Sequence, residues 1–185
     1  PPNIAYRYLP RHLSTFHQQY PEIRLEILAS NIEFNMTNRQ ADIAIRATAT
    51  PPEHLIARKL DQIQWAVYAS NAYQKNHGFP KNIKQLQQHA IIGATATMRH
   101  LPAFIWLEKH LPNNIYTRCD DMVTMSYFAD EGHALAILPN DQRRAGIKKL
   151  FVFEPGESSM LWLLTHPDLR NVERIKLVIK HLVNS

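Results

Sequence analysis

Apolar residues along this chain alternate between the spacing of a helix and the spacing of a strand. They recur at helical intervals over residues 4–16, in a helix that Pro10 should kink. Residues 23–29 then alternate apolar and charged side chains, which predicts a half-buried strand, and a short helix should follow over 32–39. Residues 42–46 (DIAIR) form a brief apolar run of the kind found in parallel sheets covered on both faces.

The same alternation continues to the end of the chain. Strands are predicted at 55–60, 65–69, 91–93, 115–119, 134–138, 150–153 and 160–165, with a weaker apolar stretch at 104–107. Helices are predicted at 71–77, 82–89, 122–131 and from 172 onward. Trp65, Trp106 and Trp162 all lie in strand-like runs, where packing explains them better than ligand stacking. This order predicts an α/β protein with largely parallel sheets.

Two polar breaks divide the pattern. Asp61-Gln62 separates two strand-like runs, and the turn Glu154-Pro155-Gly156 precedes the last strand. The segment between these two hinges should form a lobe inserted into the rest of the chain. We therefore predict one lobe from residues 1–63 plus 154–185 and a second from 64–153.

Composition excludes several classes of protein. A hydrophobic fraction of 45% over 185 residues is enough for a packed core, and no run of eighteen apolar residues occurs. The net charge of +5 is spread along the chain, and its densest groups, residues 143–149 and 174–180, lack the interleaved aromatics that stack on bases. Cys119 is the single cysteine and cannot form an internal disulfide, which fits a reducing compartment.

Catalytic signatures are also missing from the sequence. It contains no HExxH, GxSxG, P-loop or GxGxxG motif, and its five glycines are too dispersed to cradle a phosphate. Cys119 precedes Asp120-Asp121, whose charges should raise the pKa of a thiol. His12 and His17 are five residues apart and so lie off a common helical face. We expect no enzymatic activity, no cofactor and no metal.

Ordered motifs over nearly the whole chain resemble the effector-binding domain of LysR-type transcriptional regulators. They are Leu9-Pro10, Phe16, Tyr20-Pro21 and RLEI at 24–27, ADIAIR at 41–46, ARKL at 57–60, VYASNAY at 67–73, HGFP at 77–80 and GHALAILP at 132–139. Each string alone is weak, but their order and spacing are specific.

This resemblance implies an α/β fold of two Rossmann-like lobes joined by two crossover strands, similar to type II periplasmic-binding proteins. A small-molecule effector, for which we favour an anionic metabolite, would sit in the cleft between the lobes. The full regulator would be a cytoplasmic homodimer or homotetramer without a membrane partner. It would bind DNA only through an N-terminal winged helix-turn-helix that is absent from this chain.

Two features depart from the resemblance. The family's first lobe begins with a strand before its first helix, whereas this chain starts at Pro1-Pro2 in the loop that should follow. Such an absence would leave a slot in the sheet that another segment could fill. His133 and Leu135 replace the small residue and glycine usual in that motif, so His133 either faces the cleft or points outward.

The resemblance also implies a set of effector-binding positions. The first lobe would supply Asn3, Ile4, Ser30, Asn31, Arg46 and Thr48, and the second Thr95, Thr97, Asp121, Met122 and His133. Arg46 could clamp a carboxylate or pair with a neighbouring acid, and Asp121 could instead cap a helix. Backbone N–H groups at the helix starts near Ile4 and Met122 would favour an anion.

Two other classes of protein share this scaffold. A transporter's solute-binding protein would carry an export signal, which the N-terminus of this chain does not show. An enzyme resembling porphobilinogen deaminase would need a reactive cysteine or a carboxylate set in the cleft.

Overall fold

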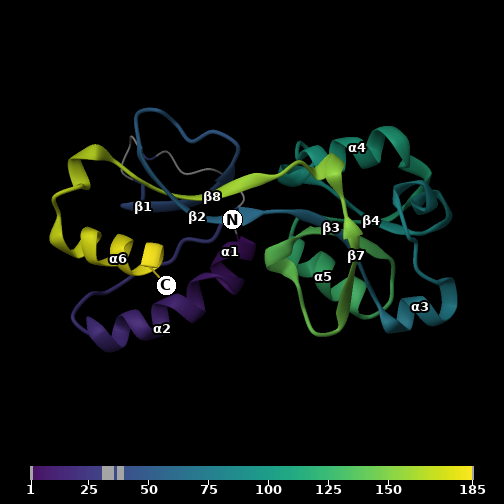
Figure 1. Cartoon of the computed structure of the whole chain (residues 1–185), viewed down its shortest axis with the longest axis horizontal. Coiled ribbons are helices and arrows are strands. Elements are labelled where there is room, and N and C mark those ends of the chain that lie inside the picture. The colour runs from purple at the N-terminus through teal and green to yellow at the C-terminus, as the bar shows by residue number, and fades with distance from the viewer. Residues whose placement is uncertain (1, 31–35, 37–39, 185) are drawn as a thin grey trace. The chain divides into compact units, whose positions relative to one another are not determined.

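The structure is a computed structural model that describes residues 2–30, 36 and 40–184, and it divides the chain into two compact units (Figure 1). The first unit comprises residues 1–63 and 159–185, and the second comprises 64–158. Each unit has its own sheet and its own hydrophobic clusters. Residues 154–158 belong to the second unit rather than the first, because Gly156 is packed against the side chain of Trp65.

Two helices open the first unit where the sequence predicts one kinked helix. They are α1 (Pro2–Arg7) and α2 (Leu9–Gln19), with the break at Tyr8. Pro10 has no N–H to donate to the carbonyl four residues earlier, so the helical hydrogen-bond ladder is interrupted just before it. The chain leaves α2 at Tyr20, whose N–H donates to the Phe16 carbonyl at 2.9 Å.

The first unit contains a three-stranded sheet in the order β1-β8-β2. Its strands are β1 (Ile43–Thr48), β2 (Ile56–Ile63) and β8 (Ser159–Thr165). Both pairings are antiparallel, so the prediction of largely parallel sheets is wrong for the described part of this unit. Strand direction is not encoded in hydrophobic period; here it follows from β8, which lies between β1 and β2 and runs against both.

The helix α6 (Glu173–Asn184) closes the chain, and Figure 1 shows it beside α2. Val178 and Leu182 of α6 join Phe16 of α2 and Leu163 of β8 in one buried cluster. Tyr8 adds a hydrogen bond from its hydroxyl to the Leu182 carbonyl at 3.3 Å. The apolar face predicted for this last helix is therefore the face that packs.

Residues 23–29 are not a strand, which corrects the prediction from their alternation. Ile23 and Leu25 do pack against the cluster around Phe16, as a half-buried strand would. Ile27 and Leu28 are exposed, however, and no described strand pairs with this segment. Alternation sets which side chains are apolar, but a strand also needs a hydrogen-bonding neighbour. The helix predicted at 32–39 lies outside the described residues except for Met36, which is buried.

Asp61 and Gln62 lie inside β2, so the prediction that they separate two strands is wrong. The pairing of β2 with β8 shifts register between Lys59 and Asp61. Such a bulge accommodates an extra residue and lets the polar pair remain exposed at a sheet edge. The end of β2 at Ile63 coincides with the division between the two units.

The second unit contains a five-stranded mixed sheet in the order β5-β4-β6-β3-β7. Its strands are β3 (Trp65–Ser70), β4 (Ile91–Ala94), β5 (Ile115–Cys119), β6 (Leu135–Pro139) and β7 (Ile147–Val152). β4 runs parallel to β5 and β6, whereas β3 pairs antiparallel with β6 and β7. The expected parallel arrangement thus holds only for β5-β4-β6.

Three α-helices accompany this sheet, namely α3 (Asn71–His77), α4 (Pro102–His110) and α5 (Met122–Asp130). The remaining short elements are 3-10 turns: the second unit contains η1 (Ile83–Gln88), η2 (Ala96–Met98), η3 (Pro112–Asn114), η4 (Asn140–Gln142) and η5 (Glu154–Gly156), and the first unit contains η6 (Pro167–Leu169). None of the helices in the described ranges has the length and apolar character needed to cross a membrane.

The apolar stretch 104–107 lies in α4, so Trp106 is helical rather than part of a strand. Ala103, Phe104 and Leu107 are buried at helical spacing, and the preceding Pro102 occupies the first turn, where proline is tolerated. The predicted caps are confirmed. The Ser70 hydroxyl accepts from Tyr73 N–H at 3.2 Å, and Gly78 ends α3 with a φ of 71°.

Candidate functional site

The carboxyl ends of the parallel strands β4 and β5 lie at one edge of the second sheet. Ala94 pairs with Cys119 in register, and the Thr95 N–H donates to the Cys119 carbonyl at 2.9 Å. Thr95 and Asp121 therefore leave the sheet side by side at this edge. Loops at such ends are frequent ligand sites in α/β sheets.

Arg118 holds this edge in place. Its Nη1 donates to the Ala94 carbonyl at 3.2 Å, and its guanidinium forms a two-pronged ion pair with Glu108 of α4, whose second bond is 3.1 Å long. The hydrogen bond from Arg118 lowers the pKa of Glu108, so the pair stays charged. Gly93 fits beside β5 because a Cβ there would come within 2.7 Å of Ile115 Cγ2.

Asp121 caps α5, which is one of the two roles considered for it. Its Oδ2 accepts hydrogen bonds from the backbone N–H and the hydroxyl of Thr124, both at 2.7 Å. Its Oδ1 is buried and finds no partner among the described residues. Because a carboxylate already occupies the positive end of the helix, a ligand anion gains little there. Met122 packs partly buried against the core.

Thr97 and Cys119 occupy different environments near this edge. Thr97 lies exposed in η2, two residues beyond Thr95. Cys119 is buried, and burial is the main cause that raises the pKa of its thiol, with Asp120 and Asp121 adding to it. A thiol with a raised pKa is a weak nucleophile. Among the described residues, no cluster of histidine, cysteine and carboxylate side chains could hold a metal.

His133 lies at the opposite edge of the same sheet, away from Thr95 and Asp121. It precedes β6, which is parallel to β4, so it sits where these strands begin. Its exposed ring contacts the Thr117 hydroxyl at 2.6 Å and packs edge-on against Phe128. The structure thus does not group His133 with the other positions predicted in this unit.

Sequence reasoning missed the residues that follow β6. Asn140, Asp141 and Gln142 lie at the carboxyl end of this strand, the edge that also carries Thr95. Gln142 is buried and donates to Asp141 Oδ2 at 2.7 Å, and Asn140 exchanges hydrogen bonds with Gln64. The rule that selected Thr95 after IIGA applies equally to the residues after ALAILP, and it could have found them.

In the first unit, Asn3 and Ile4 begin α1 and are both buried. Ile4 packs against Ile63 and Leu161, close to the edge at which β1 and β2 end. Its side chain therefore belongs to the core. Since α1 has only six residues, its start offers a weak dipole to an anion.

Arg46 and Thr48 lie in β1 near the same edge, and their side chains are on the sheet face opposite to that of Ile45. Arg46 pairs with Trp162 of β8. The Trp162 indole N–H donates to the Thr48 carbonyl at 3.0 Å. The Thr48 hydroxyl donates to the Thr50 carbonyl at 3.1 Å. Ser30 is half-buried after the irregular segment 23–29, and Asn31 lies outside the described residues.

A family comparison identifies this arrangement. The family described as "LysR substrate binding domain" matches residues 1–185 of this chain. The chain belongs to this family. As a LysR effector-binding domain it has the type II periplasmic-binding-protein-like fold, which confirms the fold class expected from the sequence motifs.

Curated relatives of this LysR domain are transcription regulators. An HTH-type transcriptional regulator of Xanthomonas campestris pv. campestris is 32% identical over 107 residues, which is 57% of this chain and 31% of that protein. The regulator CrgA of Neisseria meningitidis is 36% identical over 80 residues, 43% of this chain and 27% of that protein. The matched regions thus span less than a third of these relatives.

Solved structures agree on the fold. The match to the CrgA regulatory domain covers 98% of this chain and 93% of the CrgA chain, with a TM-score of 0.82 and 19% identity. The match to full-length AphB of Vibrio cholerae covers 99% of this chain and 65% of the AphB chain, with a TM-score of 0.77 and 17% identity. These proteins are regulators, so the alternative of a transporter's solute-binding protein is not supported.

Proposed function

We propose that this LysR domain senses a small organic acid, and that it does so as part of a larger transcription regulator. One observation carries the proposal. In each unit, predicted positions gather near the edge where strands end, Arg46 and Thr48 in the second half of β1 and Thr95 and Asp121 after β4 and β5. A ligand that binds one conformation of these residues more tightly shifts the population toward that conformation.

Arg46 is the basis for preferring an anionic effector. The two helix starts contribute less, because Asp121 already occupies the positive end of α5 and α1 is short. Arg46 lies in β1, two residues before the strand ends, and its guanidinium is a planar donor set suited to a carboxylate. The neutral hydroxyls of Thr48, Thr95 and Thr97 would then select the remainder of the molecule by hydrogen bonding.

The wider regulator follows from family membership. We propose that it works in the cytoplasm as a homodimer or homotetramer, and that it contacts DNA through an N-terminal winged helix-turn-helix rather than through this domain. The domain itself would bind its effector without transforming it. The buried thiol of Cys119, with its raised pKa, supports a role without catalysis.

A thermal-shift screen tests the effector proposal. Small organic acids would be compared with their neutral amides on the 185-residue chain and on the Arg46→Gln variant. An acid present at about one hundred times its Kd stabilises the folded state by roughly 2.7 kcal/mol, which raises Tm by roughly 5–10 °C. Arg46→Gln should lose most of that increase, whereas the exposed Arg24→Gln should keep it. An acid whose effect survives Arg46→Gln unchanged would contradict the assignment.

A further inference from the structure

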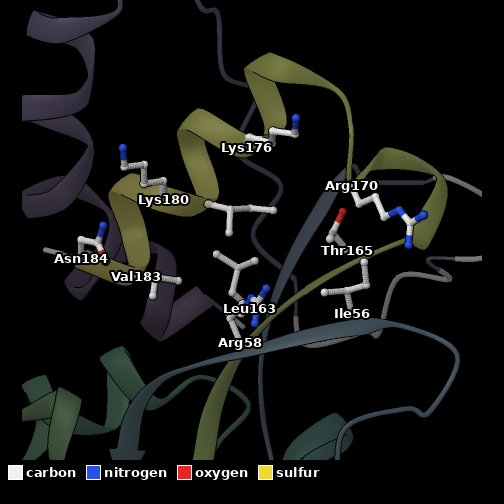
Figure 2. A pocket seen from close by; sticks show the side chains of 10 residues that line it. Ile56, Arg58, Leu163, Thr165, Arg170, Lys176, Lys180, Val183 and Asn184 are labelled. Atoms are coloured by element: carbon white, nitrogen blue, oxygen red, sulfur yellow. The ribbon is translucent and has the colours of Figure 1, made fainter.

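A hollow lies within the first unit, between α6 and the strands β2 and β8 (Figure 2). Its volume is about 520 Å³, within the range of small-molecule sites. The hollow occurs where β2 begins and β8 ends, since Ile56 pairs with Thr165 and Arg58 with Leu163. Thr48 instead pairs with Met160 at the other end of β8, so this is not the edge that carries Arg46 and Thr48.

The floor of the hollow is aliphatic. Figure 2 shows Ile56, Leu163 and Val183 directed into the space between the helix and the strands. Ile179 also lines it, one helical turn before Val183, so α6 carries a second apolar stripe beside the one buried against α2. Val183 remains 40% exposed, which leaves part of this stripe uncovered by the described residues.

The rim of the hollow is cationic. Arg58, Arg170, Lys176 and Lys180 line it from three different elements, and none of the described lining residues is acidic. Lys176 pairs with Glu173 at 3.6 Å, but both side chains are largely exposed and the pair is weak. Across the described ranges no acidic side chain is within salt-bridge distance of Arg58, Arg170 or Lys180.

We propose that this hollow binds an amphiphilic carboxylate, a small organic acid whose apolar tail covers the floor and whose charge meets the arginines. Four like charges around an apolar depression repel one another, and a bound anion relieves that repulsion. Guanidinium groups suit a carboxylate because they donate two parallel hydrogen bonds. Burial of the tail against Leu163, Ile179 and Val183 would add a hydrophobic contribution that inorganic anions lack.

Octanoate is a suitable probe, with octanamide and inorganic phosphate as controls for the charge and the tail. Titration into the methyl-labelled 185-residue chain should shift the methyl resonances of Ile56, Leu163, Ile179 and Val183 saturably. We expect octanamide and phosphate to bind at least fivefold more weakly. Equal binding of octanoate and octanamide, or saturable shifts elsewhere in the chain without shifts of these four methyl-bearing residues, would overturn the proposal.

Surface variants test the assignment without disturbing the core. Arg58→Gln and Arg170→Gln should each raise the Kd for octanoate about three- to tenfold. Arg174→Gln removes an exposed charge from α6 that does not line the hollow, and it should change Kd less than twofold. An equal loss in Arg174→Gln would mean unspecific attraction to positive charge, which refutes a built site.

Three further measurements distinguish octanoate binding in this hollow from binding elsewhere and from self-association of the chain. Arg46→Gln should leave octanoate binding unchanged, and a loss there would place octanoate at the effector site and refute the second site. Val183→Glu should weaken octanoate by charge repulsion more than Val183→Gln does. Concentration-dependent self-association that shifts the same methyl groups without octanoate would show that a second copy fills the hollow, which also overturns the proposal.

Discussion

At the scale of single residues, a buried polar contact of the core joins Tyr73 and His89. The Tyr73 hydroxyl and His89 Nδ1 are 3.0 Å apart, with exposed fractions of 1% and 8%. Burial is the main cause that lowers the pKa of His89, and His77 adds to it, while burial raises the pKa of Tyr73. Both rings therefore favour their neutral forms in the folded state.

This pair predicts a loss of stability in acid. The pKa of His89 in the folded chain is below its ordinary value of 6.5, so the unfolded chain binds the proton more readily. Its contribution is full above about pH 6.5 and declines as the pH falls through and below that value. His89→Gln should reduce the pH dependence of the free energy of unfolding between pH 7.5 and 5, measured by urea denaturation.

A second histidine, His12, should also contribute to the pH dependence of stability. The pKa of His12 is also lowered, chiefly by burial, so some pH dependence should remain in His89→Gln. His100→Gln, which replaces an exposed histidine, is the control for the loss of a histidine as such. Identical pH profiles for the parent and His89→Gln would show that the buried ring does not resist protonation.

At the scale of elements, helix ends in the second unit depend on glycine at two positions. Gly78 ends α3 with a φ of 71°, and Gly132 follows α5 with a φ of 77°. Other residues adopt a positive φ at a cost of about 1 kcal/mol or more, and the ψ of −176° at Gly78 lies in a region that glycine occupies almost alone, at about 1–3 kcal/mol for other residues. The two sites differ in space, because a Cβ at Gly132 would lie 3.0 Å from Ala72 Cβ, whereas one at Gly78 meets nothing within 4 Å.

The two glycines form a matched pair for substitution. Gly78→Ala should cost about 1–3 kcal/mol from backbone conformation alone. Gly132→Ala should lose about 1 kcal/mol for its positive φ and about 1 kcal/mol more, because α3 must also move away from the new methyl group. Chemical denaturation of the two variants measures both losses. A total loss below about 1 kcal/mol in Gly132→Ala would contradict crowding against Ala72.

At the scale of the whole molecule, the two units have separate hydrophobic clusters. Leu135 is fully buried among residues of the second unit, and Leu163 is fully buried among residues of the first. The chain passes between the units after Ile63 and again after Ser158. Separate cores joined by few connections can lose structure independently.

Hydrogen exchange should detect this independence. Leu135→Ala should destabilise the second unit by about 2–5 kcal/mol through a cavity, while the amides of β1 and β8 keep their protection. Leu163→Ala should have the reverse effect: the amides of β4 and β6 should keep their protection from exchange, while those of the first sheet should lose it. Uniform loss of protection across both sheets in either variant would mean that the chain unfolds as one cooperative unit.

Hydrophobic spacing, caps and ordered motifs determined much of this protein without coordinates. Periodicity predicted most strands, Ser70 and Asp121 marked helix starts, and the motif order indicated the LysR family. These signals are local, because they depend on which side chains are neighbours along a helix or strand. The positions at the end of β1 and after β4 and β5 were likewise predictable, since each lies at or just beyond the end of an apolar run.

Pairing between distant segments was decided only by the tertiary structure. Residues 23–29 alternate but have no described partner strand, and β8 runs antiparallel to both neighbours. His133 was expected beside Thr95 but lies at the opposite edge, because β6 runs parallel to β4. Strand order, strand direction and sheet edge depend on hydrogen bonds between residues far apart in sequence, which no local period of side chains records.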